Sequence, residues 1–219
     1  MRLLVVSPHP DDETLGAGGT LVEYRKRGWQ LFWLNFTDME VKYGYEHKAV
    51  SNRKKEIRMV SERYGFSGVR NLKLRPAGLD TYSQHKLVKM VSEFMNEVKP
   101  DTVILPFRND AHSDHRIVFD AAYSCTKIFR YSYLRRILMM EILSETDFAP
   151  AGPVFVPNFF VDISDSIDKK ISIMKIYSGQ LQKTPFPRSE NAIRSLAVCR
   201  GASAGCLCAE GFQIIKEIG

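Results

Sequence analysis

The sequence predicts a doubly wound α/β fold with a mostly parallel sheet, and three observations lead to this prediction. Short apolar segments alternate with longer segments of helical periodicity from Arg2 to Leu143. The apolar segments are uninterrupted, which is typical of strands that are covered on both faces. Right-handed crossovers through the intervening helices then give a Rossmann-like sheet.

The first elements follow this alternation closely. Arg2–Ser7 is rich in Val and Leu and predicts a buried strand. Asp11–Gly28 has helically spaced apolar residues and a glycine at its end, so we expect a helix. Gln30–Phe36 predicts the second strand. His47–Gly65 predicts the second helix, because its apolar residues share one side and a glycine closes it.

The alternation continues through the middle of the chain. Val69–Leu74 predicts a third strand, and Ser83–Val98 has the apolar spacing of a helix. Thr102–Phe107 is an uninterrupted apolar strand candidate. Asp114–Arg130 then predicts a helix, and Arg136–Leu143 predicts a fifth strand. These elements complete the predicted parallel sheet.

The last third has a different character, with prolines between shorter elements. Phe159–Ile163 predicts a strand, Ser164–Ser178 a helix capped by Ser164, and Arg188–Arg200 another helix. We find no repeat and no linker that would divide the chain. The sequence therefore predicts a single domain over residues 1–219.

Composition excludes several classes of protein. The 219 residues are 44% hydrophobic and 26% charged, which is typical of a globular domain. Four cysteines are too few for a disulfide-dense secreted scaffold. No apolar run approaches the ~20 residues of a membrane span, and no signal peptide is evident, so we expect a cytoplasmic protein without membrane contact.

The formal net charge is +6, and this excess favours anionic partners in general. The basic residues are scattered and are not interleaved with aromatic residues, so we do not expect nucleic-acid binding. A small substrate that is phosphorylated or linked to a nucleotide fits the charge, and so does a simply solvated basic surface.

A compact polar motif, His9-Pro10-Asp11-Asp12-Glu13, follows the first predicted strand. Ligands bind at this end of the strands in open α/β sheets. His9 and Asp12 are three residues apart and can turn toward one point, where imidazole and carboxylate suit a divalent metal, Zn²⁺ above all. Asp11 must then face elsewhere, where it can accept a proton from water on the metal.

The motif also has a purely structural interpretation. Asp11 or Asp12 could cap the helix that follows, and proline is common in a first helical turn. A cap needs one aspartate, however, and does not account for a His, two Asp and a Glu within five positions. The metal site is therefore the favoured interpretation.

A second polar motif, Asp110-Ala111-His112-Ser113-Asp114-His115, follows the predicted strand Thr102–Phe107. Taken alone, it could be a surface loop with two histidines. With the sheet order 3-2-1-4-5, however, the first and fourth strands are neighbours, and both motifs border the crevice where the chain reverses direction. Two distant segments then meet where this fold binds its ligands.

The two motifs together predict a catalytic metal site. His9, Asp12 and His115 would supply three ligands and leave a fourth position for water. His112 would lie close to the metal, where it can stabilise an oxyanion or donate a proton, and Asp114 could orient it.

These motifs resemble those of the LmbE-like family of metal-dependent deacetylases, also called the N-acetylglucosaminyl-phosphatidylinositol de-N-acetylase (PIG-L) family. Arg53-Lys54-Lys55-Glu56 is similar to an Arg-x-x-Glu stretch of that family. Tyr177-Ser178-Gly179-Gln180 and Ala209-Glu210-Gly211-Phe212 are similar to its late Tyr-x-Ser-Gln and Ala-Glu-x-Phe segments. The resemblance covers essentially the whole chain. Ser113 departs from the proline that is usual in the family.

The resemblance implies an LmbE-like fold and one zinc ion per chain, bound by His9, Asp12 and His115. It implies that Asp11 is the general base, and that His112, supported by Asp114, stabilises the tetrahedral intermediate or protonates the leaving amine. The implied substrate is an N-acylated amino sugar or its conjugate, and the acyl group is most often acetyl.

Two other functions stay open. A metal-free nucleotide-sugar-binding protein or transferase of the same fold class would carry a glycine-rich first turn, whereas this turn is His-Pro-Asp-Asp. A non-catalytic partner subunit would be favoured by loss of a ligand or of the base, and all of them are present. A homo-oligomer is compatible with the sequence.

Two predicted loops border the crevice and are candidates for substrate selection, Asp38–Glu46 and Ser144–Asn158. Tyr43 and Tyr45 in the first loop could contact sugar rings, although the segment could equally be an ordinary mobile loop. Arg53 could contact a phosphate or a sugar hydroxyl, or it could be a solvated charge on a helix surface.

Overall fold

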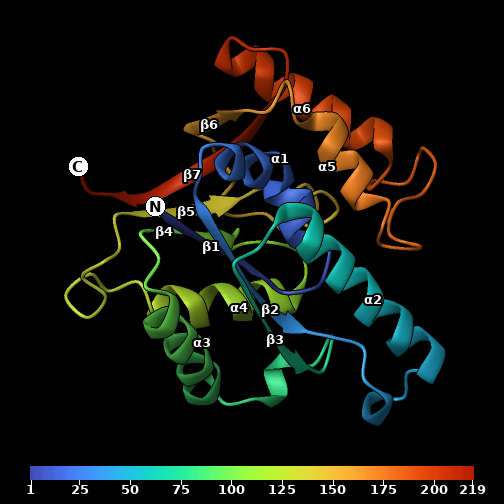
Figure 1. Ribbon diagram of the computed structural model, residues 1–219, viewed down its shortest axis with the longest axis vertical. Coiled ribbons are helices and arrows are strands. Elements are labelled where there is room, and N and C mark those ends of the chain that lie inside the picture. The colour runs from blue at the N-terminus through green and yellow to red at the C-terminus, as the bar shows by residue number, and fades with distance from the viewer.

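A single seven-stranded sheet runs through the protein, between two layers of helices (Figure 1). The computed structural model describes residues 1–219. The strand order is β3-β2-β1-β4-β5-β7-β6. The strands are β1 (Arg2–Ser7), β2 (Gln30–Thr37), β3 (Gly68–Leu74), β4 (Thr102–Pro106), β5 (Arg136–Met140), β6 (Phe159–Asp162) and β7 (Ala209–Glu217).

Helices cover both faces of this sheet. Residues of the first, second, fifth and sixth helices share one core cluster, and residues of the third and fourth share the other. The helices are α1 (Asp12–Lys26), α2 (His47–Tyr64), α3 (Gln84–Val98), α4 (Ser113–Ser124), α5 (Ile167–Met174) and α6 (Glu190–Ala204). Two short 3-10 helices, Val41–Tyr43 and Leu79–Thr81, lie in the loops after β2 and β3.

Strand β1 shows why the strand sequences are continuously apolar. Leu3 and Val5 point into one core cluster, and Leu4 and Val6 point into the other. Successive side chains of a strand alternate between the two faces, so a strand covered on both faces must be apolar at every position. All four side chains are completely buried.

The predicted order of the first five strands, 3-2-1-4-5, is confirmed, and all four pairings are parallel. The pairing of β1 with β4 places their carboxyl ends side by side, with Leu3 opposite Thr102 and Val5 opposite Ile104. The loops that carry His9 and His115 therefore leave the sheet at neighbouring positions, as the sequence predicts.

The last third is where the sequence prediction was least accurate. Strand β7 was not predicted, and it pairs antiparallel with both β5 and β6. Helix α4 ends at Ser124 instead of Arg130, and β5 ends at Met140 instead of Leu143. Helix α5 begins at Ile167, with Ser166 at its N-cap position instead of Ser164. Prolines and mixed polarity hide strand periodicity in this part of the chain.

Helix α1 packs unusually close to its neighbours through glycine. A Cβ atom on Gly16 would lie 2.6 Å from Sδ of Met140, and one on Gly19 would lie 2.6 Å from Cγ2 of Ile163. Neither distance leaves room for a side chain. These glycines therefore serve close packing of the α1 backbone.

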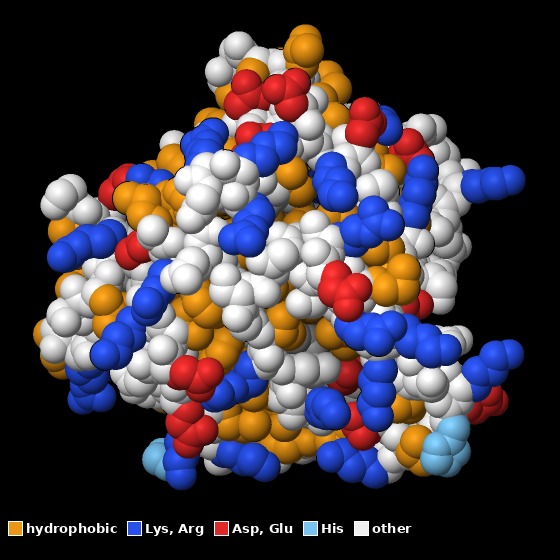
Figure 2. Space-filling view, in the orientation of Figure 1, with side chains coloured by type: hydrophobic (Ala, Val, Ile, Leu, Met, Phe, Trp, Pro, Cys, Tyr) orange, Lys and Arg blue, Asp and Glu red, His pale blue; other side chains and the backbone are white.

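On the face shown in Figure 2, Lys and Arg side chains are spread out, and acidic side chains lie among them. Charge of one sign is therefore not concentrated on this face. No helix is long and apolar enough to cross a membrane.

Candidate metal centre and its cavity

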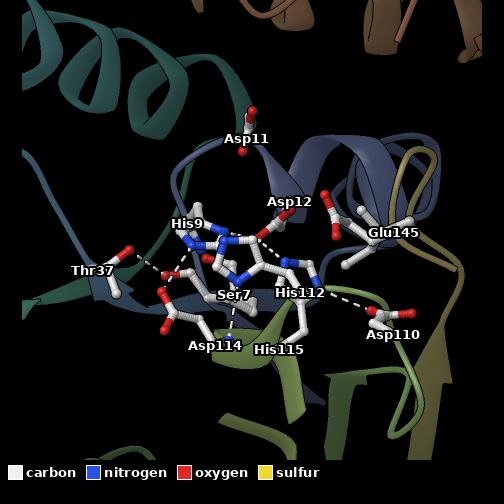
Figure 3. Close-up of polar contacts among 12 residues, drawn as sticks. Ser7, His9, Asp11, Asp12, Thr37, Asp110, His112, Asp114, His115 and Glu145 are labelled. Atoms are coloured by element: carbon white, nitrogen blue, oxygen red, sulfur yellow. Dashed lines mark hydrogen bonds and ion pairs between the residues drawn. The ribbon is translucent and has the colours of Figure 1, made fainter. Parts of the chain in front are cut away.

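Three side chains from the two polar motifs converge at the carboxyl ends of β1 and β4 (Figure 3). The ligand atoms of His9, Asp12 and His115 all lie within 4.8 Å of one another. Oδ2 of Asp12 is 3.3 Å from Nδ1 of His9 and 3.3 Å from Nε2 of His115. Two imidazoles and a carboxylate around one point match the donor set of a catalytic zinc site.

His115 is held with one nitrogen free for such an ion. Its Nδ1 lies 2.8 Å from Oδ2 of Asp110, and its side chain is buried. Nε2 is buried and faces Oδ2 of Asp12 at 3.3 Å, but it makes no hydrogen bond of good geometry. A buried polar atom whose hydrogen bonding is incomplete is costly, so it needs an explanation. A metal ion between Nε2 and Asp12 supplies one, and the residues therefore fit zinc.

His9 is backed by an acidic residue in the same way. Its Nε2 lies 3.2 Å from Oδ2 of Asp114. The Asp114 carboxylate also accepts hydrogen bonds from the backbone N–H groups of Ala77 and Leu79, at 2.7 and 3.2 Å. This anchor leaves Nδ1 of His9 facing Asp12. The Asp114 carboxylate therefore supports His9, whereas Asp114 contacts His112, the residue with which the sequence paired it, through its backbone N–H.

The electrostatics of the cluster favour a cation. Burial opposes the ionisation of Asp12, but the nearby His115 and His9 outweigh it and lower the pKa of this carboxyl. Burial alone would lower the pKa of His9, yet hydrogen bonds with Asp114 and Asp12 raise it to about 9. Asp12 and Asp110 raise the pKa of His115 to about 10, also against burial. Positive charge is thus stabilised at this point.

Asp11 stands apart from the three ligands (Figure 3) and has a strained backbone. Its φ of 132° lies in the region that favours glycine, and such a residue typically costs about 1–3 kcal/mol. Glu13 accepts a hydrogen bond from its N–H at 3.0 Å, and Arg53 donates one to the carbonyl of Pro10 at 2.9 Å. Burial, followed by the charge of Asp12, raises the pKa of Asp11 to about 7.

His112 caps helix α4 with its ring. Its Nδ1 accepts a hydrogen bond from the backbone N–H of Asp114 at 3.0 Å. A nitrogen that accepts carries no proton, so this bond assigns the proton of the neutral ring to Nε2. Burial and the neighbouring His9 lower the pKa of His112, which also favours the neutral ring. Its Nε2–H is thus a hydrogen-bond donor.

The cluster opens into a cavity of about 260 Å³ with mostly polar walls. Tyr45 and Arg53 line it, whereas Tyr43 does not. The hydroxyl of Tyr43 instead lies 3.2 Å from that of Tyr82. Arg53 is buried and pairs with Glu56 at 3.1 Å, so its interpretation as a solvated surface charge is wrong. Glu145 from the second predicted loop also lines the cavity.

Several residues around the site were given no role from the sequence. Arg188 and Gln180 come from the last third and line the same cavity, and of these Gln180 stands in the late segment that resembles the family. Asp110 was quoted within the second motif but given no role, and Glu13 stood in the first motif without one. Histidines that bind a metal usually donate their other ring N–H to a carboxylate or a carbonyl. Asp110 could therefore have been predicted as the carboxylate that pairs with His115. No sequence signal connects Arg188 to a motif 177 positions away.

Comparison with known proteins shows the family to which this chain belongs. The family model described as GlcNAc-PI de-N-acetylase, PIG-L, matches residues 4–126, which is more than half of the chain. Diacetylchitobiose deacetylase of Thermococcus kodakarensis is 25% identical over 99% of this chain and 84% of its own length.

Two solved structures show the breadth of the fold. A conserved protein of Thermus thermophilus superposes with a TM-score of 0.77 at 26% identity, covering 99% of this chain and 95% of its own. The 4-carboxy-2-hydroxymuconate hydratase of Pseudomonas putida also reaches 0.77 at 18% identity, covering 100% of this chain and 97% of its own. Since that protein is named for a hydration, the fold by itself does not select the reaction.

Proposed function

This chain belongs to the PIG-L family of N-deacetylases, and from this premise we propose that it removes an N-acetyl group from an amino sugar or its conjugate with one bound zinc ion. His9, Asp12 and His115 would hold the ion. The observation that carries the proposal is the buried Nε2 of His115, which makes no well-aligned hydrogen bond and lies 3.3 Å from Oδ2 of Asp12. His9 and Asp12, the other two proposed ligands, line a polar cavity.

When bound, zinc supplies Lewis-acid chemistry, since it polarises an acyl carbonyl and makes water more acidic. We assign the general base to Asp11, whose carboxylate borders the cavity but is not part of the ligand cluster. It would take a proton from the attacking water. The same proton can then pass to the sugar nitrogen when the C–N bond breaks, so that acetate and a free amine are released.

The role we propose for His112 is narrower than the sequence suggested. Its Nδ1 is occupied as the acceptor for the Asp114 N–H, and its Nε2–H is the available donor. A neutral donor of this kind suits stabilisation of the negative charge that develops on the acyl oxygen. We therefore place His112 at the oxyanion and assign the proton for the leaving amine to Asp11.

The walls of the cavity support a sugar as the substrate. Asp38, Tyr45 and Gln180 offer hydrogen-bonding groups of the kind that recognise hydroxyls. The curated relative from Thermococcus kodakarensis is named for diacetylchitobiose, an N-acetylated sugar. Arg53 on the same wall makes a phosphorylated or nucleotide-linked sugar a reasonable member of the test panel.

The test is acetate release by the purified, zinc-loaded protein from N-acetylated sugars, their glycosides and sugar nucleotides. We expect release from at least one of them, with an equal amount of new primary amine, and none from the Asp11→Asn variant beyond a residual rate. A parent protein that binds zinc but releases no acetate from any of these compounds would contradict the proposal.

A further inference from the structure

We infer that Arg188 is a positioning residue for this reaction, and that it fixes the orientation of the Asp11 carboxylate from across the cavity. The inference rests on the proposed function, because it assumes that Asp11 acts as the base. It assigns a role to the segment between α5 and α6, which is far from both sequence motifs.

The contact between the two side chains is specific. Nη1 of Arg188 donates a hydrogen bond to Oδ2 of Asp11 over 3.2 Å, and no other group of the chain hydrogen-bonds this carboxylate. Oδ1 of Asp11 accepts no hydrogen bond from the chain, and Asp11 lines the cavity. One oxygen is therefore held by Arg188, and the other is left for a water molecule or a substrate group.

Arg188 contacts the side chain of Asp11, whereas the neighbouring residues contact only the backbone around it. Glu13 holds the N–H of Asp11, and Arg53 holds the carbonyl of Pro10. Both fix the strained backbone, but neither touches the carboxylate. A carboxylate on a fixed backbone can still rotate about its side-chain bonds. Arg188 is thus the residue that restricts this rotation.

The segment that carries Arg188 is itself anchored at both ends. Before it, the hydroxyl of Tyr177 donates to Glu13 at 2.7 Å, and the N–H of Ser178 donates to Glu56 at 3.1 Å. After it, the Ser189 hydroxyl accepts the N–H of Ala192 and caps α6. Tyr177 thus ties the start of the segment to the first motif, Ser178 ties it to α2, and Ser189 fixes the start of α6 directly after Arg188.

Arg188 also leaves one of its own groups without a partner. Its Nε is buried and makes no hydrogen bond, although its side chain is 24% exposed. Buried polar atoms without partners are uncommon in structures that are optimised for stability alone. The arrangement directs the guanidinium toward Asp11 at the expense of its own hydrogen bonding, as expected for a functional contact.

A direct contact with the substrate is the competing role for Arg188, since its side chain borders the cavity. The two roles differ in their kinetics. Loss of a positioning residue lowers kcat and leaves KM nearly unchanged. Loss of a contact that binds the substrate as strongly in the ground state as in the transition state raises KM instead.

The experiment measures kcat, KM and zinc content for the zinc-loaded parent and for Arg188→Ala, Arg188→Lys and the control Arg194→Ala. Arg194 is a partly exposed arginine of α6 that pairs with Asp168 and Glu190 and does not line the cavity. For Arg188→Ala we expect full zinc content, unchanged KM and a kcat about 10²-fold lower, the size of effect that misplacement of a reacting group produces. Added guanidinium ion should restore part of kcat in Arg188→Ala and leave the other proteins unaffected.

The possible outcomes separate this inference from the proposed function. A parent without deacetylase activity contradicts the proposed function. An active parent whose Arg188→Ala variant keeps its kcat, or loses it without rescue by guanidinium, overturns the inference. A raised KM with unchanged kcat overturns it as well. Denaturant unfolding of Arg188→Ala, Asp11→Asn and the double variant tests the pairing without any activity, and strictly additive losses would overturn it.

Discussion

The two sides of the site are built in different ways. The metal side comes from residues at the ends of the neighbouring strands β1 and β4, and two of its ligands are backed by carboxylates of the second motif. The opposite wall comes partly from the last third, where Arg188 reaches Asp11 across 177 positions of sequence. The proposed metal site is thus built from two local motifs, whereas the proposed base is contacted by a residue of the last third.

Buried contacts show how this docking is achieved. Nζ of Lys170 in α5 donates to the carbonyl of Leu15 and to the carboxylate of Glu210, each at 2.7 Å. Glu210 in β7 also accepts the N–H groups of Gly19 and Thr20. Helix α1, which begins directly after Asp11, is therefore fastened to both α5 and β7. These contacts therefore set the position of the cavity wall that the last third contributes.

Removal of a ligand tests the metal side and should have the largest effect. We expect Asp12→Ala to lower the zinc content from about one per chain to near zero, and to abolish deacetylation with it, because the remaining two ligands are too few for a stable catalytic site. Elemental analysis of the purified proteins measures this. Asp120→Ala, which removes an exposed carboxylate of α4, should keep both zinc and activity.

Removal of the proposed base, Asp11, tests the side of the site contacted by the last third and leaves the three proposed metal ligands in place. Asp11→Asn should keep its zinc and lose about 10²–10⁴-fold in kcat, the usual contribution of a general base. Zinc content and kcat are measured on the same preparation. If the variant loses its zinc instead, the roles of Asp11 and Asp12 are interchanged and the division of the site into two sides is wrong.

The carboxylate of Asp110, which contacts the ring of His115, allows a test of the metal side that leaves all three proposed ligands in place. Asp110 holds Nδ1 of His115, and Thr146 in turn donates to Asp110 at 2.6 Å. Asp110→Asn should weaken zinc binding by about 10–100-fold, as is typical for partners of metal ligands. Competition with a chelator of known affinity measures the change. Thr146→Val should show a smaller loss in the same direction, and equal affinity in all three proteins would contradict this account.

The smallest effect concerns substrate choice on the cavity wall. Tyr45 lines the cavity, whereas the hydroxyl of Tyr43 is engaged by Tyr82. Tyr45→Phe should change the order of kcat/KM values among N-acetylated substrates without changing zinc content, and Tyr43→Phe should leave that order intact. A uniform loss on every substrate in Tyr45→Phe would show that this residue does not discriminate between them.

The same contrast explains what the sequence could predict. Continuous apolar strands and two polar motifs at strand ends were enough for the order 3-2-1-4-5 and for the meeting of His9, Asp12 and His115. Parallel strand geometry converts such local patterns into positions in space. No local pattern shows that the Asp114 carboxylate contacts His9 and is held by N–H groups of the loop after β3, so the sequence paired Asp114 with its near neighbour His112.

The last third was less predictable for a physical reason. Strand β7 lies between β5 and β6 and pairs antiparallel with both, yet its sequence mixes apolar residues with Glu210, Gly211 and Gln213. Glu210 contacts α1, Gly211 allows close packing, and Gln213 accepts a hydrogen bond from the N–H of Val156. These residues interrupt the pattern that identifies a strand. Contacts such as that of Arg188 with Asp11 depend on tertiary docking and leave no local periodicity.

The most direct test of the central claim is a titration of metal-free protein with zinc, with acetate release as the readout on a substrate identified from the panel. The account predicts no release before zinc is added, a linear rise in rate, and a sharp break at about one ion per chain. It also predicts no rise for Asp12→Ala over the same range. Full acetate release by the metal-free parent, or a break that is unchanged in Asp12→Ala, would contradict the account.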